Sequence, residues 1–191
     1  MPMMIRTFVA VPVPITSGLA EVFELLGTLG PQVRPVRREA LHVTLKFLGE
    51  MPEGRVGEIT ETIARVAARF SGFELQLQDV GRLPSRRPRV VFADLVDPDR
   101  PRSAIIELAS ALEEALAVVG FAPEKRPFRP HVTLARIRGK PPIELEELQR
   151  AYDQVRLGTV VIDQVELVRS ELGAEGPRYS ILATVKLGEP A

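Results

Sequence analysis

Apolar residues recur along the chain with two periods, one typical of strands and one typical of helices. Segments with an apolar residue at every second position, or with runs of β-branched residues, predict strands. These segments cover residues 5–13, 33–36, 40–48, 73–83, 90–96, 131–137, 155–168 and 180–187. Segments whose apolar residues recur every three or four positions predict helices at about residues 17–29, 56–70, 105–119 and 141–152. Thr16 or Ser17 is expected to cap the first helix.

The predicted elements occur twice in the same order. Each half contains a strand, a helix, a motif-bearing strand, a second helix and a further strand, and residues 8–10 and 91–93 open the two halves. This duplication predicts an α/β (α+β) fold with two pseudo-symmetric lobes, in which antiparallel-rich sheets carry helices outside and enclose a central cleft. No Gly- or Ser-rich linker divides the chain, so we expect one bilobal domain over residues 1–191.

The composition is that of an ordinary globular protein without net charge. Hydrophobic residues make up 45% of the chain, and 25 basic side chains balance 25 acidic ones. Binding to nucleic acid would therefore depend on local basic clusters rather than on total charge. The chain contains no cysteine, which excludes disulfides, thiol catalysis and zinc–thiolate sites. We see neither a signal-peptide pattern nor an apolar run of membrane-spanning length, so we expect a cytoplasmic protein.

Both histidines of the chain lie in the same four-residue sequence. His-Val-Thr-Leu occurs at residues 42–45 and again at residues 131–134. Each copy falls in a predicted strand, where successive side chains point to opposite faces. The imidazole and the hydroxyl of each copy therefore share one face, while Val and Leu lie on the other. A pseudo-two-fold axis between the lobes would direct both His–Thr pairs into one cleft.

Two imidazoles and two hydroxyls at one cleft suit acid–base chemistry on a phosphorus or acyl centre. A histidine titrates near pH ~6.5, so one imidazole can accept a proton while the other donates one. The hydroxyls of Thr44 and Thr133 can donate hydrogen bonds to an anion. Metal binding is the competing use of the histidines, but threonine is an uncommon ligand and no carboxylate cluster accompanies the motifs. We therefore expect no metal and no other cofactor.

The two copies resemble the H-x-T-x signature of the 2H phosphoesterases. Residues 126–130 (Arg-Pro-Phe-Arg-Pro), together with Ala135-Arg136, are similar to the RNA 2′,3′-cyclic phosphodiesterase branch, also called the 2′–5′ RNA ligase-like proteins. Residues 41–50 fit this branch as well, and the likeness extends from Arg6 to Tyr179. The resemblance implies metal-independent hydrolysis of an RNA terminal 2′,3′-cyclic phosphate to a 2′-phosphate, with 2′–5′ ligation as an energy-neutral reversal.

The resemblance also implies a role for each residue of the site. The expected residues are the proton donor His42, the proton acceptor His131 and the phosphate-binding residues Thr44, Thr133 and Arg136. Strict alternation would place Arg136 on the face opposite His131, so we expect the strand to end or bulge near Ala135.

Two other functions are compatible with the same residues. The cleft could belong to a non-catalytic module that binds RNA or nucleotides, or to a cyclic phosphodiesterase that acts on small nucleotides. Under the main hypothesis the partner is RNA with a 2′,3′-cyclic phosphate end, bound by a monomer that does not contact a membrane. Further basic residues that could contact RNA are Arg126 and Arg129 and the cluster of Arg86, Arg87 and Arg89.

Overall fold

Two antiparallel sheets form the framework of the protein in the computed structural model, which describes residues 2–84, 86–97, 103–173 and 176–188. The four-stranded sheet has the order β3 (His42–Pro52), β1 (Met4–Pro12), β8 (Gln164–Gly173) and β9 (Gly176–Lys186). The five-stranded sheet has the order β2 (Val33–Pro35), β6 (His131–Ile137), β5 (Val90–Val96), β4 (Phe73–Leu83) and β7 (Arg156–Ile162). Each sheet thus contains one copy of the motif, in β3 and in β6.

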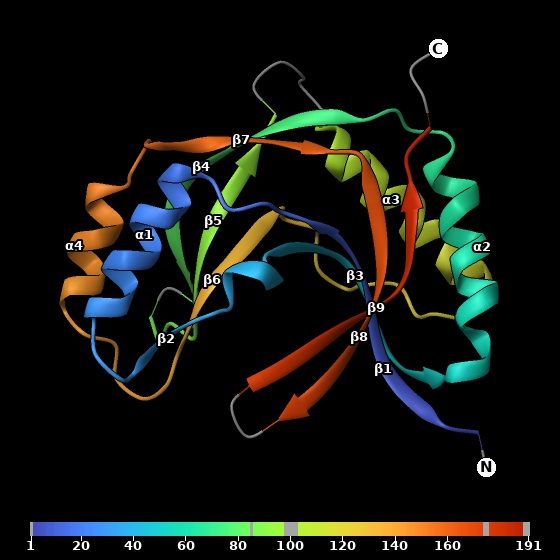
Figure 1. Ribbon diagram of the computed structural model, residues 1–191, viewed down its shortest axis with the longest axis horizontal. Coiled ribbons are helices and arrows are strands. Elements are labelled where there is room, and N and C mark those ends of the chain that lie inside the picture. Colours follow the sequence, from blue (N-terminus) through green and yellow to red (C-terminus); the bar gives the residue numbers. More distant parts are fainter. Residues whose placement is uncertain (1, 85, 98–102, 174–175, 189–191) are drawn as a thin grey trace.

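Helices lie on the outer sides of the two sheets (Figure 1). α1 (Ser17–Thr28) and α4 (Glu144–Ala151) pack on the five-stranded sheet, whereas α2 (Val56–Ala67) and α3 (Ala104–Val118) pack on the four-stranded sheet. Short 3-10 helices, η1 (Arg38–Ala40) and η2 (Glu53–Arg55), precede β3 and α2. The predicted α+β class with two lobes of antiparallel sheet is confirmed. In the described part of the chain, no helix has the length and apolar character needed to cross a membrane.

The lobes do not correspond to the two halves of the sequence. α1 follows β1 of the four-stranded sheet but packs against β2 and β7 of the other sheet. α3 follows β5 of the five-stranded sheet but packs against β3 of the other sheet. The duplicated order of elements is therefore preserved, but each half of the chain contributes one helix to the opposite lobe.

The single strand predicted over residues 155–168 is wrong, because two strands of different sheets occupy this segment. β7 ends at Ile162 and β8 begins at Gln164. Between them lies Asp163, whose backbone carbonyl accepts a hydrogen bond of 2.9 Å from the amide of Leu187. Apolar and β-branched residues flank this junction and neither Pro nor Gly stands at it, so the pattern contains no signal for the change of sheet.

The other predicted elements agree closely with the structure, and their apolar faces meet in one continuous core. The strands at residues 73–83, 90–96 and 131–137 have the predicted bounds. The first motif strand extends further, to Pro52, and the closing strand begins earlier, at Gly176. Thr16 caps α1, since its hydroxyl oxygen accepts a hydrogen bond of 3.2 Å from the amide of Leu19. The sequence Asp97-Pro98-Asp99 also predicts a turn, but residues 98 and 99 lie outside the described residues.

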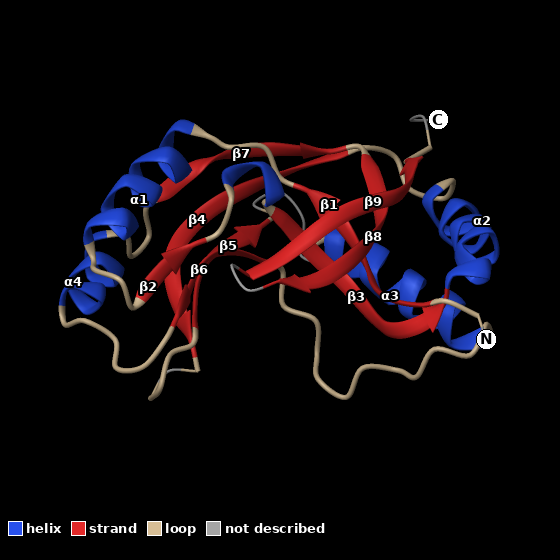
Figure 2. Ribbon diagram, turned by 60° about the horizontal axis from the view of Figure 1, so that its bottom comes forward, coloured by secondary structure: helices blue, strands red, loops and turns tan. Residues whose placement is uncertain are grey.

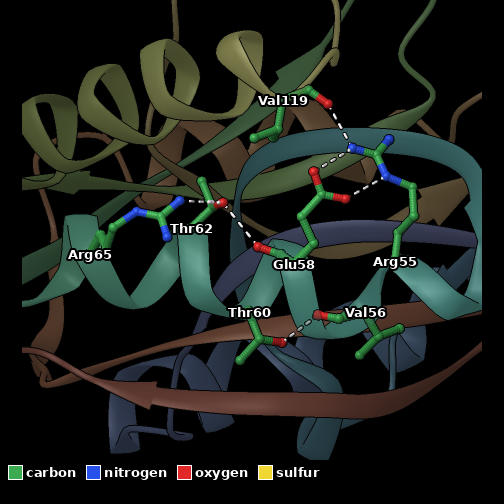
Figure 3. A network of polar contacts seen from close by, with 7 residues as sticks. All are labelled: Arg55, Val56, Glu58, Thr60, Thr62, Arg65 and Val119. Carbon is green, nitrogen blue, oxygen red and sulfur yellow. Dashed lines mark hydrogen bonds and ion pairs between the residues drawn. The ribbon is translucent and has the colours of Figure 1, made fainter.

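A polar network joins the start of α2 to the end of α3 (Figure 3). The guanidinium of Arg55 donates to the carboxylate of Glu58 at 2.8 Å and to the carbonyl of Val119 at 2.6 Å. It also lies over the ring of Phe121, 5.1 Å from the ring centroid. These contacts hold the beginning of the loop that follows α3, and this loop leads to the second motif strand.

Candidate active site

The two motif copies have the same irregular strand geometry. A register shift against β1 leaves Leu45 as an extra residue of β3, and a shift against β5 leaves Leu134 as an extra residue of β6. Each bulge reverses the alternation of faces, so Phe47 and Arg136 return to the face of the motif histidine. The bulge predicted near Ala135 is confirmed.

Each motif histidine is oriented by a backbone carbonyl two residues before it. Nδ1 of His42 lies 2.7 Å from the carbonyl oxygen of Ala40, and Nδ1 of His131 lies 2.8 Å from that of Arg129. A carbonyl oxygen only accepts hydrogen bonds, so Nδ1 carries a proton in both rings. Nε2 is then the nitrogen that accepts a proton when the imidazole is neutral and donates one when it is charged.

The motif side chains line a cleft of about 420 Å³, to which strands of both sheets contribute. The structure brings all five expected site residues together there: His42, Thr44, His131, Thr133 and Arg136. No aspartate or glutamate of the described chain is among the residues that line this cleft. β3 and β6 contact each other near the middle of the molecule, between the two outer groups of helices (Figure 2).

Aromatic rings surround the imidazole of His42. Phe8 stacks on it with 5.0 Å between the ring centroids, and Tyr179 approaches it edge-on at 5.2 Å. Burial lowers the pKa of His42 below 6.5, although the hydrogen bond to its backbone carbonyl acts in the opposite direction. The positive charges of Arg136 and His131 lower this pKa further. His42 is therefore mostly neutral at pH 7 in the free protein.

The imidazole of His131 has different neighbours. Phe92 meets it edge-on with 5.6 Å between centroids. Its cross-strand partner in β5 is Asp94, at the position that Pro12 holds in the first copy. Burial raises the pKa of the Asp94 carboxyl, while the positive charges of Arg129 and His131 oppose that shift. The second imidazole thus has a carboxyl group opposite it in the sheet, where the first has an apolar ring.

The remaining arginines considered from the sequence lie outside this cleft. Those that do not line it are Arg86, Arg87, Arg89, Arg126 and Arg129. Arg129 contributes its backbone carbonyl to the orientation of His131 instead. Within the described ranges, no group of three or more His, Cys, Asp or Glu side chains could hold a metal ion.

Sequence reasoning assigned no role in the cleft to several residues that line it, among them Arg6, Phe8, Arg138 and Tyr179. The position of Arg138 contained a usable signal, because it follows Arg136 by two residues and shares its face once the bulge is placed. Phe8 and Tyr179 had no such signal. Tyr179 reaches the first histidine only because β9 pairs with β8 beside β1.

A family model described as the 2'-5' RNA ligase superfamily matches residues 28–174, and the chain belongs to this superfamily. The family predicted from the two motifs is confirmed. Among curated relatives, an RNA 2',3'-cyclic phosphodiesterase of Aeropyrum pernix is 35% identical over 170 residues, which cover 88% of this chain and 94% of the relative. Another protein of that name, from Methanothermobacter thermautotrophicus, is 30% identical over 189 residues, with 97% and 100% covered.

Solved structures agree with this assignment. A protein of Thermus thermophilus superposes with a TM-score of 0.77 at 28% identity, covering 97% of this chain and 100% of that one. E. coli LigT in complex with 3'-AMP superposes with a TM-score of 0.68 at 27% identity, covering 97% and 99%. The similarity therefore includes both lobes and the cleft between them.

Proposed function

We propose that this protein hydrolyses the 2′,3′-cyclic phosphate at the end of an RNA strand to a 2′-phosphate, using His42 and His131 as general acid and base. One observation carries the proposal: each motif copy contributes a threonine and a histidine to the lining of the same cleft, and a backbone carbonyl holds Nδ1 of each histidine, so that Nε2 remains for proton transfer. The curated relatives named RNA 2',3'-cyclic phosphodiesterase support the substrate class. E. coli LigT, whose solved structures superpose on this chain, has been crystallised in complex with 3'-AMP and with phosphate, which supports a phosphate-containing ligand for this protein.

The reaction needs one group that accepts a proton and one that donates a proton. Water attacks phosphorus and transfers a proton to Nε2 of neutral His131. The P–O3′ bond breaks, and O3′ takes the proton from Nε2 of charged His42, which leaves a 2′-phosphate and a 3′-hydroxyl. Each proton transfer contributes about 10²–10⁴ in rate.

Charge on the phosphate is balanced by three further side chains. The hydroxyls of Thr44 and Thr133 donate to the non-bridging oxygens, and Arg136 supplies a positive charge. A bound phosphate also favours the charged form of His42, because an anion nearby raises the pKa of an imidazole. Substrate binding thereby offsets the effect of burial and prepares His42 to act as the acid.

The same site would join RNA ends if the 5′-hydroxyl of a second strand replaced water as the nucleophile, which forms a 2′–5′ bond without consuming energy. That the chain is a single bilobal domain and works as a monomer in the cytoplasm stays a prediction from the sequence. Size-exclusion chromatography of the purified protein tests the oligomeric state.

The direct test is incubation of the purified protein with a short RNA that ends in a 2′,3′-cyclic phosphate, in the presence of EDTA. We expect conversion to the 2′-phosphate, and no conversion by the variant His42→Ala/His131→Ala. A 3′-phosphate product, or activity that EDTA abolishes, would contradict the proposal. A parallel assay with a cyclic mononucleotide distinguishes an RNA-end enzyme from one that acts on small nucleotides.

A further inference from the structure

Three exposed arginines lie side by side where β2 pairs with β6, next to the cleft. Arg34 of β2 is the cross-strand partner of Arg136, so the two side chains share a face with their Cβ atoms about 5 Å apart. Arg138 follows Arg136 on the same face, about 7 Å further along the strand. Its amide donates to the carbonyl of Gln32 at 2.8 Å, which extends the pairing with β2. These three residues are called the arginine cluster below.

The arginine cluster has no acidic partner. None of its members forms an ion pair with any residue in the described ranges. Elsewhere on the surface, Arg38 pairs with Glu24 and Arg169 pairs with Glu171. Like charges directly opposite each other in a sheet are destabilising, so an unbalanced cluster at this place calls for an external anion.

A second hollow in the protein provides a contrast. It has a volume of about 240 Å³ and is lined by Arg82, Glu146, Gln149, Arg150 and Asp153. There the charges have both signs, and Arg82 pairs with Glu146 at 3.0 Å. Positive charge without a counter-charge is thus a property of the cleft and its edge rather than of every concave surface of this neutral chain.

The three arginines of the cluster lie at different distances from the motif histidines. The charge of Arg136 acts on His42, so this residue lies at the reacting end. Arg138 also lines the cleft, further along β6, and Arg34 lies one strand outward. The cluster therefore extends from the reacting phosphate towards the edge of the five-stranded sheet.

We infer that Arg34 and Arg138 bind the phosphodiester that lies 5′ of the terminal nucleotide, so that the site selects RNA ends over cyclic mononucleotides. This inference rests on the proposed function and specifies its substrate. A nucleoside 2′,3′-cyclic phosphate has only the reacting phosphate, whereas an oligonucleotide presents a second phosphate one nucleotide away. Arg136 holds the first phosphate, and the two outer arginines hold the second by charge-assisted hydrogen bonds.

The test compares Arg34→Gln and Arg138→Gln with the matched control Arg69→Gln, which removes an exposed charge just beyond α2 and outside the cleft. For a trinucleotide with a 2′,3′-cyclic phosphate end, we expect Arg34→Gln and Arg138→Gln each to lower kcat/KM about 3- to 10-fold. The slope of log kcat/KM against log salt should become shallower by about 0.7 per arginine. For the cyclic mononucleotide, the loss of kcat/KM in Arg34→Gln and Arg138→Gln should be much smaller than for the trinucleotide, and Arg69→Gln should leave kcat/KM unchanged on both substrates.

Equal losses on both substrates, an unchanged salt slope, or the same loss in Arg69→Gln would overturn the inference. A wild-type protein that opens neither substrate would instead refute the proposed function. In that case, fluorescence anisotropy with a 5′-labelled trinucleotide that ends in a 2′-phosphate still measures whether the arginine cluster binds RNA. Weaker binding by Arg34→Gln and Arg138→Gln, but not by Arg69→Gln, supports the inference, and equal binding by all variants rejects it.

Discussion

The two motif copies combine one backbone design with two different chemical environments. Both strands have a bulge after the threonine, and both histidines donate Nδ1–H to a carbonyl two residues earlier. Beyond the shared residues, the first copy continues with Lys46-Phe47 and the second with Ala135-Arg136. The repeated motif therefore explains why the two histidines have the same geometry. The residues around each motif differ between the copies, and they give the two sides of the site a different charge and polarity.

The strongest test of this comparison is removal of each imidazole. His42→Ala and His131→Ala should each lower kcat by about 10²–10⁴, because each removes one of the two proton transfers. The double variant should cost little more than either single one, since residues that act as a unit are not additive. Single-turnover kinetics on cyclic-phosphate RNA provide the measurement. Nearly full activity in one of the single variants would mean that only one imidazole is catalytic.

The residue that follows the bulge is Lys46 in the first copy and Ala135 in the second, and we expect these two residues to contribute differently to the stability of the fold. Lys46 is fully buried and donates to Glu113 at 2.8 Å and to the carbonyl of Ala122 at 2.9 Å, whereas the second copy has the small Ala135. Glu113→Gln should lower the free energy of unfolding by about 3 kcal/mol, because it leaves the ammonium group buried without a counter-charge. Lys46→Met should cost less, since Glu113 keeps contact with water. Urea denaturation of both variants measures the difference, and the reverse order would argue against it.

At the next position, the first copy has the aromatic ring of Phe47 and the second copy has the positive charge of Arg136. Arg136→Gln should lower kcat/KM about 10- to 100-fold, because a hydrogen bond to a charged group is worth about 1.5–3 kcal/mol. The matched change in the first copy, Phe47→Leu, removes no charge and should cost less. Steady-state kinetics at low substrate concentration compare the two. Equal losses would show that the cation is not what distinguishes the sides.

The threonines test the part of the site that is the same on both sides. Thr44→Val and Thr133→Val should each lower kcat/KM by about 10-fold, since valine keeps the shape of the strand residue but loses the hydroxyl. Far-UV circular dichroism checks that the fold is retained. Wild-type kinetics in both variants would reduce the threonines to structural residues of the strands.

The smallest expected effect concerns the titration of His42. Its pKa lies below 6.5 because of burial and nearby positive charge, so Arg136→Gln should move it upward and Arg69→Gln should not. NMR titration of the His42 imidazole in the two variants measures this shift directly.

The pH dependence of a variant tests the role of His42. If His42 is the acid, the residual activity of His131→Ala should fall as the pH rises through the pKa of His42, because the donor loses its proton. Activity that rises with pH in that variant would assign the base role to His42.

Some structural features could be predicted from the sequence before the structure was known. The alternation of faces, together with the phosphate-binding role that the family resemblance implies for Arg136, predicted that the strand ends or bulges near Ala135, and β6 bulges there. Thr16 was one of two candidates for the cap of α1, and it makes the capping hydrogen bond. The strand predicted at residues 155–168 failed because the chain changes sheets at Asp163, where nothing in the alternation of apolar residues marks the junction.

The sequence by itself determined that the histidine and the threonine of each copy share a face and that the chemistry comes in two copies, because strand alternation over three residues and a repeated motif are local properties. Only the tertiary structure decided which sheet each helix covers, that Phe8 and Tyr179 enclose His42, and that Arg34 lies opposite Arg136. The physical reason is that burial of apolar surface is not directional. An apolar stripe specifies that a face will be covered, whereas the covering partner follows from strand pairing between segments far apart in the chain.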